Sequence, residues 1–329
     1  MENSEKRKRQ FISKPLFVQS IKSLRVIWLA MTLGAALIFV IINIAIGSKN
    51  IFTNINMTSV TEYVKDEDLS WLKVLGLLET MGFSLTRIQA MSQLDLNSIL
   101  AELIYKITGI LLPMIYVMIA SNKLVVAQVT DGSMAYVLST PTNRKTVIRT
   151  QYIFLLLSIV VMYVIITVCA IGSEGIATLI AMNNNSGTVR WLPLKTFLFC
   201  IGSFFAMFGI SGICFGASCF FNKSNQSLGV GGGFCVLSFI CCILGLFGNE
   251  AFVAVGIGVR TMYLFNYLSI FYLIDTASMS NFTNALFVHD VDLSAFSFNW
   301  IWELAILIVI GIIFAYIGAR KFVKKDLPL

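Results

Sequence analysis

Very few side chains in the hydrophobic stretches of this chain could do chemistry. Glu102 and Lys106 stand four residues apart in one such stretch, with the acid on the N-terminal side, so on a helix they share a face and can form an ion pair. Ionisable residues at membrane depth usually face a bundle interior or a water-filled pathway. The pair therefore has two interpretations: a place on a substrate pathway, or mutual neutralisation near the membrane boundary. Glu303, one turn into the last hydrophobic stretch, fits a side chain that reaches back to that boundary.

The other residue types used in catalysis or metal binding form no recognisable site. His289 is the only histidine, and no cysteine pair has zinc-ligand spacing. The sequence contains no G-x-x-x-x-G-K-[ST] phosphate loop, no H-E-x-x-H pair and no G-x-S-x-G elbow. We therefore expect no catalytic residues, no metal site and no ATP site on this chain. All seven cysteines fall in predicted spans and fit packing residues better than a disulfide framework: Cys169, Cys200, Cys214, Cys219, Cys235, Cys241 and Cys242.

The composition indicates a membrane protein. Of the 329 residues, 57% are hydrophobic and only 12% are charged, whereas about 25% of residues are charged in a soluble domain. So few charges cannot solvate the surface of a soluble protein of this size. The composition excludes a soluble enzyme, a disordered chain and a collagen-like fibre.

Six stretches approach or exceed the roughly 20 apolar residues that a helix needs to cross the hydrocarbon core. They lack the strict alternation of barrel strands. The sequence thus predicts an all-α integral membrane protein, a single transmembrane domain over residues 1–329, with spans at 26–46, 99–120, 152–172, 197–221, 228–248 and 301–318.

The distribution of basic residues predicts that both termini are cytoplasmic. Most of the 24 lysines and arginines fall in residues 1–25, in the segment 121–151 and in the tail 319–329, which the positive-inside rule places in the cytoplasm. A seventh crossing within 251–275 would put the basic tail outside. We therefore expect 251–275 to be a re-entrant or interfacial element on the outer side. The largest outer loop is 47–98.

Residues 1–25 combine a basic tail with an amphipathic stretch. Phe17, Ile21 and Leu24 recur at helical spacing, and Gln19, Lys22 and Ser23 lie on the other side. This pattern predicts a helix lying in the inner headgroup layer, where Lys and Arg meet anionic lipid. The alternative is a plain basic tail that runs into the first span. No small-residue cleavage site follows, so the first span is expected to remain as an anchor.

Glycines concentrate in the fourth and fifth predicted spans. Gly212 and Gly216 form a small-xxx-small pair that permits close helix contact. Gly231 belongs to a run of three glycines at 231–233. Because only residues 222–227 join the two spans, we expect a tightly packed antiparallel hairpin. Alternatively, the glycine run loosens the start of its helix, as in transporters with broken helices.

The segment 121–151 between the second and third spans contains the most informative pattern. Asp131 can cap a short helix over residues 133–139, and Pro141 ends it. This helix is expected to expose apolar side chains, and basic residues follow it at the start of the next helix. It suits insertion into a groove on a partner; the alternative is an ordinary interfacial loop. The candidate contact residues are Asp131, Gly132, Ser133, Met134, Tyr136, Leu138, Pro141, Arg144, Lys145 and Arg149.

This segment resembles permease subunits of bacterial ATP-binding cassette (ABC) transporters of the type-2 exporter class. Members typically show D-x-G-[ST]-x-x-x-L-L-S-x-P-x-x-R-x-x-[IV] here, and this chain has DGSMAYVLSTPTNRKTV at 131–147. Where many members carry an acid just upstream, this chain has Gln128. Weaker similarity covers PLFVQSIKS at 15–23, YLSIFYLID at 267–275 and the basic end FVKKDLPL at 322–329.

The resemblance implies two six-span permease subunits, identical or different, clamped by two ATP-binding subunits in the bacterial cytoplasmic membrane. ATP and Mg would bind the partner subunits, and the short helix after Gly132 would be the coupling helix. The few charges within the spans suit an amphipathic peptide, drug or lipid-like cargo moved outward. Two alternatives stay open: a non-transporting sensor or immunity module that captures antimicrobial peptides through the loop 47–98, and an ion-coupled carrier.

Overall fold

The computed structural model describes residues 12–48, 107–139, 143–183, 193–248, 259–273 and 299–324. These ranges contain helices and no β-strand. Six of their helical stretches are long and apolar enough to cross a membrane, which confirms the predicted all-α membrane fold with six spans. They are Lys14–Ile41, Thr108–Thr130, Arg144–Ile180, Thr196–Phe220, Ser224–Gly245 and Trp300–Lys324.

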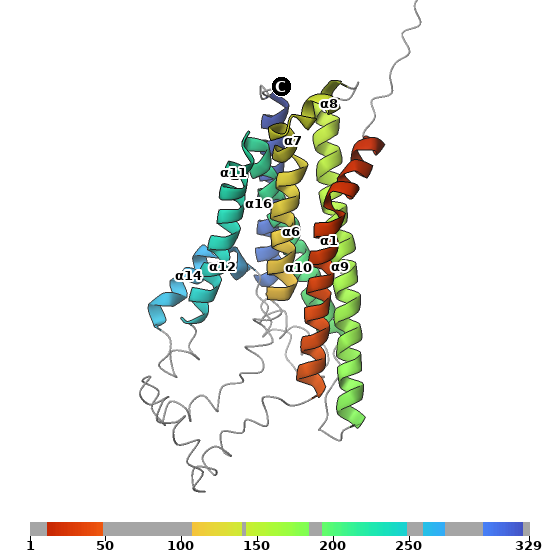
Figure 1. The fold of residues 1–329 in the computed structure, drawn as a ribbon. Coiled ribbons are helices and arrows are strands. Elements are labelled where there is room, and N and C mark those ends of the chain that lie inside the picture. Colours follow the sequence, from red (N-terminus) through yellow and green to blue (C-terminus); the bar gives the residue numbers. More distant parts are fainter. Residues whose placement is uncertain are drawn as a thin grey trace, which may run out of the picture.

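The start of α1 and the end of α16 lie at the same end of the bundle, together with α7, α8 and α11 (Figure 1, top). We call this the α8 end. A chain that enters and leaves at one end crosses an even number of times, which favours six spans over seven. The described elements are α1 (Lys14–Ser48), η1 (Ile107–Leu111), α6 (Leu112–Leu124), α7 (Val126–Thr130), α8 (Ser133–Ser139), α9 (Arg144–Asn183), α10 (Pro193–Phe220), α11 (Ser224–Ser227), η2 (Leu228–Gly232), α12 (Gly233–Leu246), η3 (Arg260–Tyr263), α14 (Leu264–Leu268), η4 (Ile270–Leu273) and α16 (Asn299–Lys324).

Helix α1 joins the predicted headgroup helix and the first span without a break. Its 35 residues would extend about 50 Å at 1.5 Å per residue, well beyond a hydrocarbon core of about 30 Å. Its first turns lean away from the rest of the bundle (Figure 1). Leu16, Ser20 and Leu24 recur every four residues and are buried. Phe17 meets Phe154 of α9 edge-on, with the ring centroids 5.3 Å apart.

Ser158 of α9 joins three helices. Its carbonyl oxygen accepts a hydrogen bond from the indole N–H of Trp28 on α1 at 3.0 Å. Its hydroxyl accepts one from the Tyr116 hydroxyl on α6 at 2.7 Å and donates to the Leu155 carbonyl. Polar groups in hydrocarbon have no water to bind, so such internal pairs fix the relative positions of α1, α6 and α9.

Pro113, in the first turn of α6, disturbs the second span. Proline has no N–H to donate to the carbonyl four residues earlier, which here belongs to Gly109. That carbonyl lies in the π-helical turn η1 and accepts a hydrogen bond from the buried Tyr163 hydroxyl of α9 at 2.5 Å. The neighbouring helix α9 thus supplies a donor to the carbonyl that the proline cannot serve.

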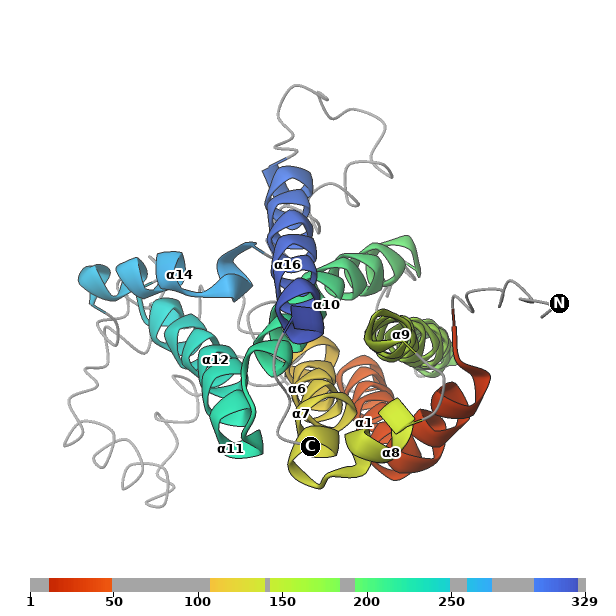
Figure 2. The ribbon, with the colours of Figure 1, turned by 90° about the horizontal axis from the view of Figure 1, so that it is seen from above.

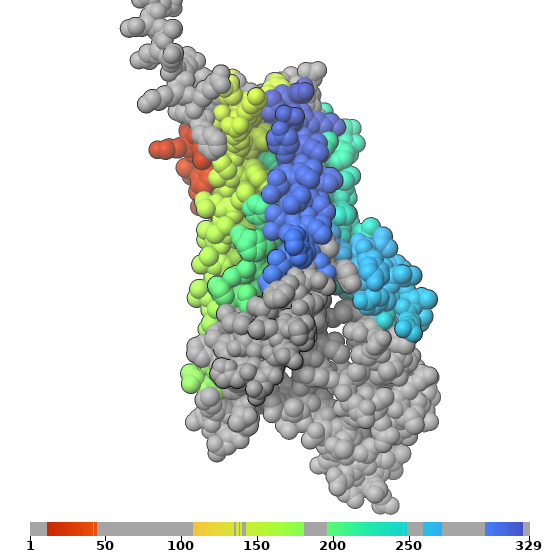
Figure 3. Space-filling view, turned by 180° about the vertical axis from the view of Figure 1, so that it is seen from behind, coloured from red at the N-terminus to blue at the C-terminus, as the bar shows by residue number. Residues whose placement is uncertain are grey.

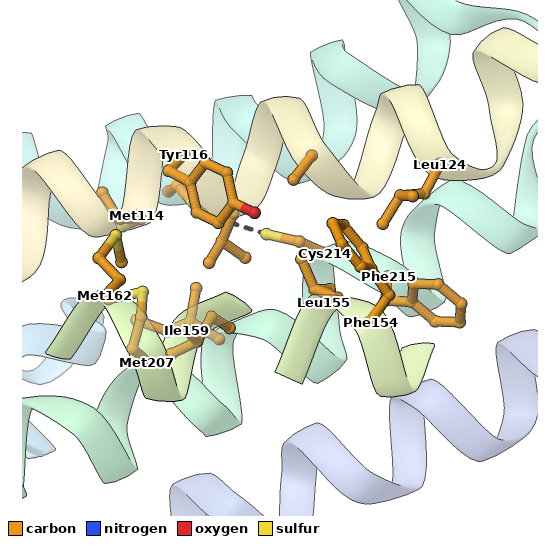
Figure 4. Packing of buried hydrophobic residues seen from close by; sticks show 14 of the residues in the cluster. Met114, Tyr116, Leu124, Phe154, Leu155, Ile159, Met162, Met207, Cys214 and Phe215 are labelled. Carbon is orange, nitrogen blue, oxygen red and sulfur yellow. Dashed lines mark hydrogen bonds between the residues drawn. The ribbon is translucent and has the colours of Figure 1, made fainter. Parts of the chain in front are cut away.

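Buried side chains from α6, α9 and α10 form the centre of the bundle. Figure 4 shows Tyr116, Met162, Met207 and Phe215 in the space between these three helices, and all four are buried. By contrast, α16 runs along the surface (Figure 3, blue), where apolar side chains such as Trp302 are exposed. An exposed apolar surface on a membrane-spanning helix fits contact with lipid or with another membrane subunit.

Helices α10 and α16 pack with their backbones in close contact. A Cβ atom added to Gly212 would lie 2.2 Å from the carbonyl oxygen of Gly311, and one added to Gly216 would lie 2.6 Å from that of Phe314. These distances leave no room for a side chain. The small-xxx-small pair therefore faces the sixth span.

Helix α12 contacts α10 only near the connection between them. There the Ser218 and Ser227 hydroxyls are 3.0 Å apart, and the Cys214 and Cys235 sulfurs are 3.7 Å apart. Gly231, in the π-helical η2, is buried, and a Cβ added to it would lie 3.7 Å from Ala217. Beyond this point α12 diverges from α10 (Figure 2). The two spans do not form a hairpin that is tight along its length.

The described part of 251–275 turns back along α12. Its three elements, η3, α14 and η4, contain only four or five residues each, too few to cross a membrane. The Ser269 hydroxyl donates to the Ser238 carbonyl of α12 at 2.7 Å, and Phe271 packs against Phe239. This segment lies at the end of α12 remote from α11 (Figure 1). Residues 251–258, 274 and 275 lie outside the described part.

The backbone contact between α10 and α16 predicts that alanine substitution destabilises the protein at one glycine and not at another. Gly212→Ala forces the two helices apart and should destabilise the protein by about 1–3 kcal/mol, the usual cost of overpacking. Gly172→Ala on α9 adds its Cβ where nothing lies within 4 Å and should be neutral or slightly stabilising. Thermal unfolding of both variants in detergent checks this. Equal melting temperatures would contradict the close packing.

Candidate functional site

A short reversal of the chain at the α8 end separates α7 from α8. The Asp131 N–H donates to the Ala127 carbonyl at 2.9 Å, which ends α7. Gly132 follows with φ at +69°, a left-handed conformation that glycine adopts without a steric penalty. The chain then enters α8, which covers the residues predicted for a short helix. Asp131 and Gly132 are both exposed.

Helix α8 has one buried side and one exposed side. Tyr136 is 80% exposed, whereas Met134 is 0% exposed and belongs to the main hydrophobic cluster with Val129 and Val147. The expectation that Met134 is exposed was therefore wrong: its side chain holds α8 against the bundle. Sequence alone could not distinguish the two because both are large and apolar. The side chain of Leu138 and the residues 140–142, which include Pro141, lie outside the described part.

An amide pair connects the turn before α8 to the start of the third span. The Gln151 side chain of α9 is fully buried and donates from Nε2 to Oε1 of Gln128 on α7 at 2.9 Å. The Gln128 carbonyl also accepts a hydrogen bond from the Ser133 hydroxyl at 3.2 Å. The residue that departs from the acidic pattern thus makes a neutral contact between α7, α8 and α9. The only sequence signal for it was an uncharged polar residue, Gln151, at the edge of a predicted span.

The start of α9 combines a basic surface with a link to α1. Arg144 is half-buried, while Lys145 and Arg149 are exposed. Next to them, the hydroxyl of the fully buried Thr150 accepts a hydrogen bond from the Ser13 backbone N–H at 3.1 Å. These contacts connect α7 to α9, and α9 to the start of α1.

The far end of the bundle contains the carboxylates of the described spans. Glu174 of α9 accepts a hydrogen bond from the buried Thr196 hydroxyl of α10 at 2.5 Å. We did not identify Glu174 from the sequence because the predicted third span ended at Gly172, whereas α9 continues to Asn183. Glu303 lies half-buried in α16. The described residues include no group of three His, Cys, Asp or Glu side chains that could hold a metal ion.

The candidate pathway residues and the outer loop also fall outside the described residues. Glu102 and Lys106 precede residue 107, where the second span becomes described. The outer loop is undescribed from residue 49 onward.

The two sides of α8 should respond differently to truncation. Met134→Ala opens a cavity in the hydrophobic cluster and should cost about 2–5 kcal/mol of stability. Tyr136→Ala removes an exposed side chain and should change stability by less than about 0.5 kcal/mol. Thermal unfolding of the purified chain measures both effects. A Tyr136→Ala variant as unstable as Met134→Ala would contradict the observed orientation of α8.

Comparison with known protein families gave one family match. The sequence model of a family described as ABC-2 family transporter protein matches residues 17–327. No curated protein and no solved structure gave a significant match. The family match covers all six described spans, the α7–α8 segment and the elements between α12 and α16. The chain therefore belongs to the ABC-2 family of transporters, as a multi-pass permease of the ABC type.

Proposed function

We propose that this chain is the permease subunit of an ATP-driven exporter and that α8 is its coupling helix. The observation that carries the proposal is the two-sided α8: Tyr136 is available to a partner, while Met134 fixes the same helix to the bundle. The chain has no phosphate-binding loop of its own, so energy from ATP has to enter through a contact surface. The ABC-2 family works in general with an ABC ATP-binding partner.

The contacts around α8 suggest how the movement passes into the spans. A partner that pushes on Tyr136 displaces α8 as a unit, because Met134 is buried behind it. The hydrogen bond between Gln128 and Gln151 then transmits the displacement to α9. From α9, Ser158 connects to α6 and α1 through hydrogen bonds to Tyr116 and Trp28. Such a chain of packed and hydrogen-bonded groups is suited to switching between two arrangements.

The proposed complex contains two permease subunits and two ATP-binding subunits that hold ATP and Mg. Its α8 end faces the cytoplasm of a bacterial cell, where exposed cations such as Lys145 and Arg149 obey the positive-inside rule. Within the described spans, carboxylates are limited to Glu174 and Glu303, near the far end. A pathway with so few fixed charges suits an amphipathic peptide, drug or lipid-like cargo. The resemblance to exporters favours outward transport of this cargo.

A carboxylate placed on the exposed side of α8 should uncouple the complex. In the purified complex with its ATP-binding subunit in nanodiscs, Tyr136→Asp should lower the permease-dependent ATPase rate at least about tenfold, the effect expected of a central contact residue. The matched control is Gln226→Asp, which adds the same charge at an exposed position of α11 at the same end. It should leave the rate within about twofold of the parent.

Both variants are first checked for unchanged thermal stability, so that a loss of activity reports coupling and not unfolding. An unchanged ATPase rate in Tyr136→Asp would contradict the coupling assignment, as would an equal loss in Gln226→Asp.

A further inference from the structure

The first turns of α1 and the facing turns of α9 enclose a groove of about 310 Å³. This volume is at the lower end of the ~300–1,000 Å³ range of ligand pockets. Apolar side chains line nearly all of the groove, among them Ile21, Trp28, Leu157 and Val161. The groove lies on the side of the α8 end where α1 leans away from the bundle (Figure 1).

The few polar groups in the wall of the groove are already paired, except at one position. The Trp28 indole N–H donates to the Ser158 carbonyl, and the Ser158 hydroxyl donates to Leu155 and accepts from Tyr116. Arg25 is different: it lines the groove and its side chain is exposed. Within the described part of the chain, no hydrogen bond or ion pair of Arg25 is found. An occupant would therefore meet an apolar wall and a single cation.

The surroundings of Arg25 are positively charged. Lys14 and Lys22 are also exposed on α1, which contains no acidic residue. Helix α9 contains none before Glu174. Among the described residues at the α8 end, the one acid is Asp131, which is exposed at the turn between α7 and α8. The groove thus combines an apolar interior with a cationic rim near the start of α1.

We propose that this groove binds an anionic phospholipid, with one acyl chain against Trp28 and Val161 and the phosphate at Arg25. An acyl chain would cover the apolar wall of the groove, and the negative headgroup complements Arg25, the one cation that lines it. Basic side chains at the membrane surface attract anionic lipid with about 1 kcal/mol each, roughly a fivefold preference over a neutral headgroup. The proposal rests on the membrane orientation in the proposed function, which places this end in the inner leaflet.

A bound lipid would fill the space between two elements that the coupling path connects. The residues that line the groove fall within 17–29 of α1 and 154–161 of α9. It also contains Ser158, which holds α1, α6 and α9 together. The lipid site is therefore placed to stiffen the contact between α1 and α9.

Quenching of Trp28 fluorescence by brominated acyl chains tests the proposal. The full chain, with the other four tryptophans replaced by Phe, is placed in two sets of nanodiscs. One set contains brominated phosphatidylglycerol and the other brominated phosphatidylcholine, over the same series of mole fractions. We expect about fivefold tighter binding of phosphatidylglycerol, judged from the mole fraction that gives half-maximal quenching. Arg25→Gln should abolish this preference, whereas Arg320→Gln, an exposed cation on α16 beside Tyr316, should preserve it.

A matched pair of substitutions tests the groove itself. Val161→Phe fills the groove and should reduce quenching by both lipids. Val164→Phe adds the same bulk on the same helix at a position that is 57% exposed and outside the groove, and should change nothing. Native mass spectrometry of the chain with its own tryptophans provides a second measure of bound phosphatidylglycerol, in case the single-tryptophan variant does not fold.

Equal quenching by the two lipids, or a preference that survives Arg25→Gln, would overturn the proposal. So would unchanged quenching in Val161→Phe. Both leaflets of the nanodisc have the same composition and no ATP-binding subunit is present. The result therefore depends neither on membrane orientation nor on coupling, and its failure is distinguishable from failure of the proposed function.

Discussion

The structure depends on one constraint: in the hydrocarbon core, polar groups have to find their partners inside the protein. Pro113 leaves the Gly109 carbonyl without its helical donor, and Tyr163 of another helix supplies one. Ser158 uses both its hydroxyl and its carbonyl to join α1 and α6 to α9. Each of these pairs ties one span to another, so the requirement for satisfied polar groups also determines which helices are joined.

Close backbone contact supplies the second means of holding the bundle. Side chains gain little from leaving lipid for another apolar surface, so membrane helices associate through van der Waals packing and small residues. Between α10 and α16, Gly212 lies against Gly311 with no room for a Cβ. This rigid pair contrasts with α12, which meets α10 near one end only (Figure 2). The bundle thus combines a firmly packed pair with a more peripheral helix on which α14 folds back.

The sequence predicted the parts of the fold that depend on length and composition. Six spans, the short helix over 133–139 and a non-spanning element within 251–275, of which 259–273 are described, follow from hydropathy, turn residues and the distribution of charge. The partner of Gly212 did not follow, because a glycine pattern shows that a close contact exists and not which helix provides it. Likewise, Met134 and Tyr136 have similar hydrophobic character, and only tertiary packing determines that one is buried. The hydrogen bond between Gln128 and Gln151 joins two residues that are 23 positions apart, with α8 between them. Only the folded chain brings them together.

The central claim is that an ATP-binding partner contacts the exposed side of α8. Site-specific photocrosslinking tests it most directly, with a photoreactive amino acid at position 136 and, as a control, at position 316, where Tyr316 is exposed on the span α16. In the intact complex, illumination should give a covalent adduct with the ATP-binding subunit from position 136 and none from position 316. A complex that co-purifies but gives no adduct at 136, or equal adducts at both positions, would contradict the account.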